Sequence, residues 1–176
     1  MASDVPTARL FLALWPPPEV RLRLEALQQG WSWPPRAAPV RADRLHLTLH
    51  FLGNVPLERL DAFAHALDVP TEPLALDLAG ATPRLWPGGL AVLEFAPPPA
   101  LLRLHAALAD ALTGLGWPVE SRRYRPHVTL ARRAAGARPP SEGAPAPAWW
   151  HADRGYVLVR SSPARGYEVL RSYAHP

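Results

Sequence analysis

The sequence predicts an α+β fold with a mainly antiparallel sheet. Short strand-like segments and amphipathic helical segments follow one another in the order strand, helix, strand, helix, strand, strand, helix, strand, strand, strand. No glycine-rich phosphate loop follows a predicted strand, which argues against Rossmann and P-loop nucleotide-binding folds. The 176 residues, 48% of them hydrophobic, suit a single domain over residues 1–176.

Prolines and a glycine bound the first two elements. The apolar run over residues 9–15 predicts a strand, and the three prolines that follow it end the strand. Apolar residues among arginines predict a helix that begins at Glu19 and ends before Gly30.

The next elements are predicted from periodicity and turn residues. A strand is expected over residues 45–52, ending in a turn at Gly53-Asn54, and a helix over residues 57–67. Two further strands are expected over residues 74–78 and 90–95, joined by a connection rich in proline and glycine.

The C-terminal third contains the strongest helical pattern. Apolar residues recur at helical spacing over residues 101–115, and a strand is expected over residues 124–131. Residues 134–148 form a low-complexity segment that predicts a loop. Strands over residues 156–160 and 167–170 close the chain around a hairpin-like turn.

Composition excludes several classes of chemistry. The chain has no cysteine, so it forms no disulfide and has no cysteine nucleophile or metal ligand. Every basic side chain other than histidine is an arginine, and the net charge of +4 predicts a mildly basic surface rich in phosphate-binding groups. No segment approaches the ~18 apolar residues of a membrane span. We therefore expect a cytoplasmic protein with no membrane contact.

A short internal repeat is the most informative feature. Arg44-Leu-His-Leu-Thr-Leu49 and Arg125-Pro-His-Val-Thr-Leu130 agree at the arginine, histidine, threonine and final leucine, and the two histidines lie 81 residues apart. Chance would give only about 0.24 H-x-T triplets in a chain of this composition. A spacing near half the chain predicts two pseudo-symmetric lobes, each contributing one motif. We call His46 to Leu49 the first motif and His127 to Leu130 the second motif.

Strand geometry places the histidine and threonine of each motif on one face. Side chains alternate along a strand, so His46 and Thr48 point one way, about 6.5 Å apart, while the flanking leucines point into the core. His127 and Thr129 follow the same rule. Two such strands would present two imidazoles and two hydroxyls to one small anion.

This set of groups suits hydrolysis of a five-membered cyclic phosphodiester. One neutral imidazole can take a proton from water, and one charged imidazole can protonate the departing ribose oxygen, because imidazole titrates near pH 6.5. Threonine hydroxyls can donate to the non-bridging oxygens, where charge develops. The mechanism requires no metal and no cofactor.

Two further histidines are less informative. His46 and His50 have the i, i+4 spacing of a zinc half-site on a helix, but the intervening residues favour a strand and include no glutamate. In a regular strand His50 shares the face of His46, which leaves a substrate contact open. His105 lies on the apolar side of its predicted helix and is expected to be a partly buried, hydrogen-bonded histidine.

The chain resembles the 2H phosphoesterases, and among them the bacterial and archaeal RNA 2′,3′-cyclic phosphodiesterases once called 2′–5′ RNA ligases. The resemblance covers most of the chain. It is carried by Arg9 to Leu14, Leu45 to Val55, Tyr124 to Arg132, and Ser161 with Gly166-Tyr167.

The resemblance implies a bilobal fold of two mainly antiparallel sheets with flanking helices around a central groove. It implies that His46 donates a proton to the leaving 3′ oxygen and that His127 activates water. By the same match Thr48, Thr129 and Arg132 bind phosphate. Phe51 matches a position suited to stacking on a base, although in a regular strand it points opposite His50, as a core residue would.

The implied activity is hydrolysis of RNA 2′,3′-cyclic phosphate ends to 2′-phosphomonoesters, by a monomer. Three alternatives remain open. The same groups would serve 2′–5′ RNA ligation, or hydrolysis of small nucleotides such as 2′–5′ oligoadenylate or ADP-ribose cyclic phosphate. A non-enzymatic RNA-end binding protein is the third, but pure binding needs arginines more than a matched acid and base.

Overall fold

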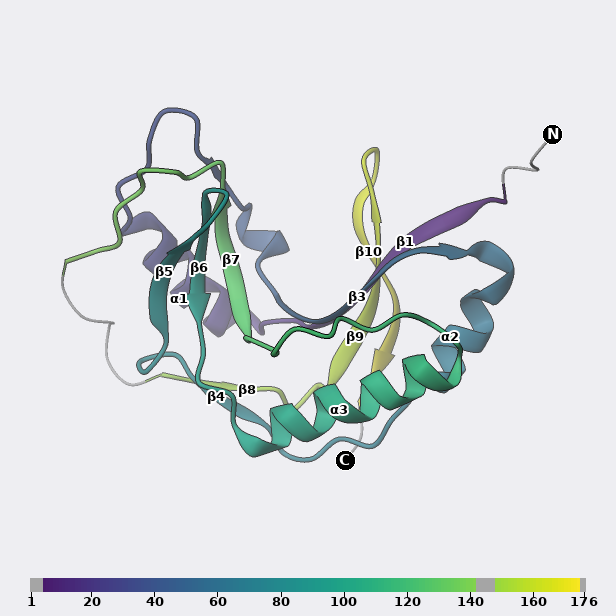
Figure 1. Ribbon diagram of the computed structural model, residues 1–176. Coiled ribbons are helices and arrows are strands. Elements are labelled where there is room, and N and C mark those ends of the chain that lie inside the picture. The colour runs from purple at the N-terminus through teal and green to yellow at the C-terminus, as the bar shows by residue number, and fades with distance from the viewer. Residues whose placement is uncertain (1–4, 142–147, 175–176) are drawn as a thin grey trace.

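The computed structural model describes residues 5–141 and 148–174. It forms one eight-stranded sheet with a separate two-stranded sheet, and all of the strand pairs in them are antiparallel (Figure 1). The strands are β1 (Thr7–Leu14), β2 (Ala38–Pro39), β3 (Leu47–Pro56), β4 (Ala75–Asp77), β5 (Thr82–Trp86), β6 (Leu90–Glu94), β7 (His127–Arg132), β8 (Trp149–His151), β9 (Tyr156–Ser162) and β10 (Gly166–Tyr173). The helices are α1 (Pro18–Gln29), α2 (Leu60–Ala66) and α3 (Pro99–Gly114), with short 3-10 turns η1 (Ala42–Arg44) and η2 (Leu57–Arg59).

The predicted α+β class and the three helices are confirmed. The prediction missed β2, β5 and β8, because each is short and flanked by proline, glycine or loop residues. The turn expected at Gly53-Asn54 is wrong: β3 continues through both residues to Pro56, paired with β1. Of the loop expected over residues 134–148, residues 142–147 lie outside the described part of the chain.

The order of strands in the large sheet is β10-β9-β1-β3-β7-β6-β5, with β2 also paired to β7. One half, β10 to β3, combines the two ends of the chain, and the other half, β7 to β5, comes from the middle. Between β3 and β7, the described residues form a single ladder pair, Leu47 with Val128. The two motifs therefore lie at the seam where the two halves of the sheet meet.

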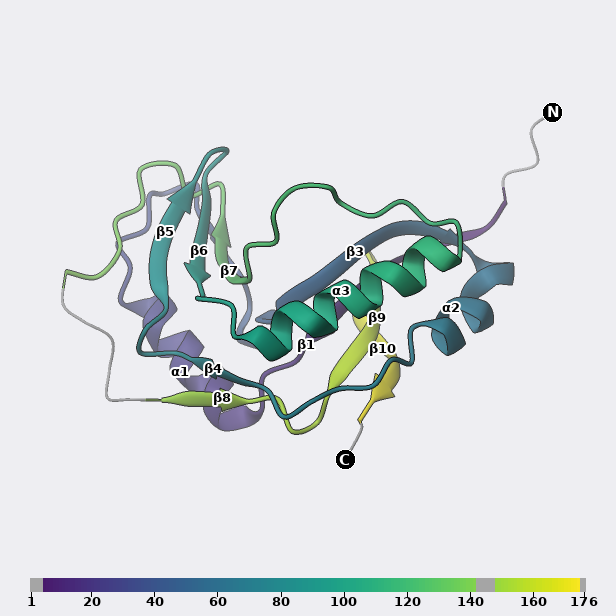
Figure 2. The same cartoon turned by 60° about the horizontal axis from the view of Figure 1, so that its bottom comes forward.

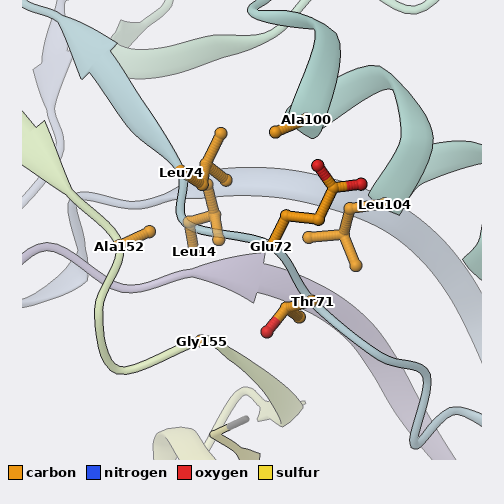
Figure 3. A pocket seen from close by; sticks show the side chains of 8 residues that line it. All are labelled: Leu14, Thr71, Glu72, Leu74, Ala100, Leu104, Ala152 and Gly155. Carbon is orange, nitrogen blue, oxygen red and sulfur yellow. The ribbon is translucent and has the colours of Figure 1, made fainter. Parts of the chain in front are cut away.

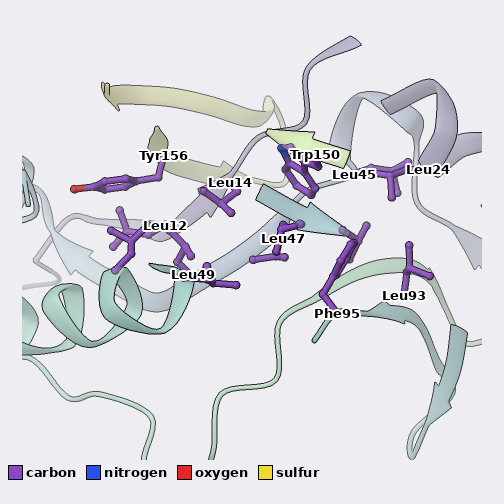
Figure 4. Close-up of a cluster of buried hydrophobic side chains, with 14 of the residues drawn as sticks. Leu12, Leu14, Leu24, Leu45, Leu47, Leu49, Leu93, Phe95, Trp150 and Tyr156 are labelled. Atoms are coloured by element: carbon purple, nitrogen blue, oxygen red, sulfur yellow. The ribbon is translucent and has the colours of Figure 1, made fainter. Parts of the chain in front are cut away.

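Leucines from the sheet and the helices form the core on one face of the sheet (Figure 4). Helix α3 runs along this face and lies in front of β1 and β3 in the view of Figure 2. It begins at a proline, which suits a helix start. Its buried residues recur three or four positions apart: Leu101, Leu104, Leu108 and Leu112. Each fully buried leucine contributes about 1.5–3 kcal/mol. This packing leaves the opposite face of the sheet for other side chains.

No helix in residues 5–141 or 148–174 combines the length and the apolar character needed to cross a membrane.

Candidate active site

The histidine and threonine of each motif lie on the face of the sheet that the core leaves open. The apolar residues of the motifs are buried: Leu47, Leu49, Val128 and Leu130. The two histidines and two threonines of the motifs are only partly buried. The predicted alternation is therefore confirmed, although His46 stands just before β3 rather than within it. We call this open side of the sheet the motif face.

The two motifs meet crosswise. Leu47 and Val128, the middle residues of the two H-x-T triplets, are partners in an antiparallel ladder. Residues that flank such a pair face each other in opposite order, so His46 lies toward Thr129 and Thr48 toward His127. The ladder thus relates the two triplets by a local pseudo-twofold axis. A small anion between them would meet an imidazole and a hydroxyl from each strand.

His46 and His127 each make an equivalent hydrogen bond to a backbone carbonyl two residues earlier. Nδ1 of His46 lies 2.7 Å from the carbonyl oxygen of Arg44, and Nδ1 of His127 lies 2.7 Å from that of Arg125. A carbonyl only accepts, so Nδ1 must carry the proton in each ring. The neutral tautomer therefore leaves Nε2 as the nitrogen that can accept a proton.

Aromatic side chains flank both imidazoles. The ring of His46 stacks on Phe11 and Trp15, at centroid distances of 4.9 and 5.3 Å, and meets the edge of Tyr167 at 5.5 Å. The ring of His127 lies 4.4 Å from that of Trp86. The sequence alone did not single out Trp15 or Trp86, because they reach the motifs only through strand pairing.

Burial makes both imidazoles weaker bases than a free histidine. Desolvation lowers the pKa of His46 to about 4, and the positive charges of Arg132 and His127 act in the same direction. Desolvation also lowers the pKa of His127, but the carboxylate of Glu94 opposes this. The two sites thus differ in their electrostatic environment despite their similar geometry.

Glu94 was another residue that sequence reasoning missed. It is the ladder partner of His127, and two arginines hold its carboxylate. Arg125 binds it with two hydrogen bonds of 3.1 and 2.7 Å, and Arg84 lies 3.3 Å away. These contacts keep the pKa of Glu94 below its usual range, with the hydrogen bond from Arg125 as the largest cause. The acidic group beside His127 is therefore charged at neutral pH.

Arg132 ends β7 with an exposed side chain close to the motifs. Its charge lowers the pKa of both motif histidines, which places it near both. No salt bridge to Arg132 is present among the described residues, so its guanidinium is available to an anion. Arg133 follows with a φ of 52°, a left-handed conformation that is uncommon outside glycine. The hydrogen bond from Ala134 N to Gly89 O supports this turn.

Two bulges in β3 reverse the expected orientation of His50 and Phe51. The register against β1 shifts on either side of the pairs Phe11–Phe51 and Leu12–His50. His50 is therefore buried, with Nε2 2.8 Å from the carbonyl oxygen of His105, and the shared face with His46 predicted for a regular strand is wrong. Phe51 is 57% exposed and pairs with Phe11, which stacks on His46. The bulges thus bring Phe51 to the motif face. Phe51 is therefore not the core residue that a regular strand would have made it.

Two cavities are lined by residues other than the motif histidines and threonines. A crevice of about 10 Å³ lies beside the N-terminal half of α3, with Thr71 and Glu72 among its lining residues, and has room for at most about one water (Figure 3). A larger cavity of about 320 Å³ borders α1 and is lined mainly by apolar residues such as Leu27, Leu93 and Leu130.

Comparison with known proteins gives one consistent result. The sequence model of the 2′-5′ RNA ligase superfamily matches residues 16–156. The chain is 35% identical to an RNA 2′,3′-cyclic phosphodiesterase of Escherichia coli K12, over 94% of this chain and 96% of that protein. It is 34% identical to an RNA 2′,3′-cyclic phosphodiesterase of Thermus thermophilus, over 73% of this chain and 70% of that protein. The structure of E. coli LigT complexed with 3′-AMP superposes with a TM-score of 0.78 and 30% identity, covering 96% of this chain and 98% of that one.

Proposed function

The chain belongs to the 2′-5′ RNA ligase superfamily, and on that premise we propose that it hydrolyses RNA 2′,3′-cyclic phosphate ends to 2′-phosphomonoesters. It is a phosphoric diester hydrolase with the fold of the LigT structures. One observation carries the proposal: the Leu47–Val128 pair sets the two H-x-T triplets crosswise on one face.

We propose His127 as the base and His46 as the acid. His127 Nε2 takes a proton from water as the water oxygen bonds to phosphorus. The bond from phosphorus to the 3′ oxygen breaks, and His46 gives a proton to that oxygen. Nδ1 of each ring is occupied by a backbone carbonyl, which supports proton transfer at Nε2.

The remaining groups would bind the phosphate and the nucleoside. Thr48 and Thr129 would donate hydrogen bonds to the non-bridging oxygens. Arg132 would supply positive charge without having to break a salt bridge to another described residue. Phe51, exposed on the motif face, would stack on a base. The anionic phosphate would also raise the pKa of each imidazole, so that one of them holds the proton that the leaving oxygen requires.

The direct test is a short RNA that ends in a 2′,3′-cyclic phosphate, incubated with the protein in the presence of EDTA. We expect conversion to a phosphomonoester, because in the described part of the chain no three histidine or carboxylate side chains cluster as metal ligands. Loss of turnover that a divalent metal restores would contradict the two-histidine mechanism.

The name of the superfamily makes ligation the second candidate. Joining a 2′,3′-cyclic phosphate to a 5′-hydroxyl replaces water with a ribose hydroxyl and uses the same acid and base. Adding a second RNA with a 5′-hydroxyl to the assay separates the two, since only ligation lengthens the chain. The cytoplasmic location and the monomeric state stay predictions from the sequence.

A further inference from the structure

Three stacked rings lie next to the first motif, on the side of the sheet opposite the motif face. His105 of α3 stacks on His50 of β3 at 4.0 Å and on Tyr124 at 3.9 Å, with interplanar angles of 19° and 17°. His50 Nε2 also donates to the carbonyl oxygen of His105 at 2.8 Å. The stack therefore joins β3, α3 and the segment that leads into β7.

Tyr124 links the first motif to the segment that leads into the second motif. Its hydroxyl donates to the carbonyl oxygen of Thr48 at 3.0 Å, and its backbone lies three residues before His127. Burial raises the pKa of Tyr124, so the hydroxyl stays protonated and remains a donor. One side chain thus links the phosphate-binding threonine of the first motif to the approach of the second.

The seam needs such a connection. Beyond Leu47 and Val128, the described residues of β3 and β7 form no further ladder pair, so backbone groups on this edge of β3 need other partners. A single pair also does little to limit how far the strands rotate against each other. The Tyr124 hydroxyl satisfies one such carbonyl, that of Thr48, whose side chain would bind the phosphate.

We propose that Tyr124, supported by the stacked rings of His105 and His50, is a positioning residue that places the Thr48 hydroxyl for phosphate binding. This inference rests on the proposed function of the motifs. Tyr124 touches no reacting atom in this proposal. It acts through the backbone of Thr48.

The test is Tyr124→Phe, which removes the hydroxyl and keeps the ring. Loss of one neutral hydrogen bond predicts a fall in kcat of roughly 3- to 10-fold and a rise in KM, because a misplaced Thr48 hydroxyl also holds the phosphate of the bound substrate less well. Tyr173→Phe is the matched control, because the Tyr173 hydroxyl also donates to a backbone carbonyl at 3.0 Å, that of Ala64, outside the motifs. We expect this control to lose stability to a similar degree and to keep the wild-type kcat.

A double-mutant cycle separates positioning from general loosening of the fold. In a Thr48→Ala background the Tyr124→Phe change should leave kcat unaltered, since the hydroxyl that it positions is gone. In a Thr129→Ala background it should have its full effect. An unchanged kcat for Tyr124→Phe, or an equal loss in both backgrounds, would overturn the proposal.

The affinity for inorganic phosphate tests the role of Tyr124 without requiring turnover. Phosphate needs the Thr48 hydroxyl but no catalysis, so Tyr124→Phe should weaken its affinity in the wild-type and Thr129→Ala proteins and leave it unaltered in Thr48→Ala. If the wild-type protein leaves the cyclic phosphate intact, the proposed function fails, and the phosphate affinities still decide the role of Tyr124. Equal affinities for wild type and Tyr124→Phe would reject that role.

Discussion

Leu47 of β3 and Val128 of β7 are partners across an antiparallel ladder, although 81 residues separate them in the chain. Both side chains are fully buried, so the flanking histidines and threonines must point to the opposite face. This apolar pair organises the polar site: it sets which histidine lies beside which threonine.

His46→Ala and His127→Ala should each lower kcat by at least ~10², the usual contribution of a general acid or base. The double variant should lose little more than the worse single variant, because the two groups act in one step. His65→Ala is the control, since His65 also bonds a backbone carbonyl through Nδ1 but lies exposed on α2. Steady-state kinetics on a cyclic-phosphate RNA would measure this. A motif variant with wild-type kcat would remove that histidine from the mechanism.

Arg132→Ala should raise KM for an oligonucleotide, with a larger effect at low salt, because phosphate contacts weaken as salt rises. Turnover of a cyclic mononucleotide should change less if Arg132 binds a neighbouring backbone phosphate. Arg23→Ala removes the same charge from an exposed position on α1, and it should leave both substrates unaffected. Equal losses on the two substrates would instead place Arg132 at the scissile phosphate.

The pH profile should be bell-shaped, since one imidazole must be neutral and the other charged. In the free protein burial lowers the pKa of His46 to about 4 and lowers that of His127 as well, so kcat/KM should peak below pH 6.5. Bound phosphate raises both pKa values, so the kcat profile should lie at higher pH than the kcat/KM profile. Profiles that are flat from pH 5 to 9 while chemistry limits the rate would argue against two-histidine catalysis.

The product should carry its phosphate on the 2′ oxygen. This follows from the role of His46 as donor to the 3′ oxygen, which rests on the family match. Phosphorus NMR, or chromatography against authentic 2′- and 3′-monophosphates, would identify the product. A 3′-phosphate would mean that the 2′ oxygen leaves, and the assigned orientation of the substrate would then be wrong.

Stability should fall on the acid side because of the His50–His105 stack. Burial lowers the pKa of His105 to about 4 and lowers that of His50, so the unfolded chain binds protons first. The stabilisation is fully present above the unfolded pKa of about 6.5 and is lost as pH falls from there toward about 4. Thermal unfolding across this range would measure it. His105→Phe keeps a ring beside Tyr124 and cannot be protonated, so its Tm should depend less on pH.

The sequence by itself determined the local features. The period of two along a strand assigned Leu47 and Leu49 to the core and His46 and Thr48 to the other face, and the structure agrees. The helical spacing over residues 101–115 likewise predicted α3 to within two residues at its start. These features depend on neighbours a few residues away, so local pattern suffices to predict them.

Tertiary structure alone decided the rest. The two bulges in β3 turn His50 into the core and Phe51 outward, because β3 must keep its leucines packed against α3 while pairing with β1. Strand pairing brings Trp86 and Glu94 to His127 across more than thirty residues of chain. The register of strands far apart in the sequence is set by how the buried leucines fit together, and no local repeat contains that information.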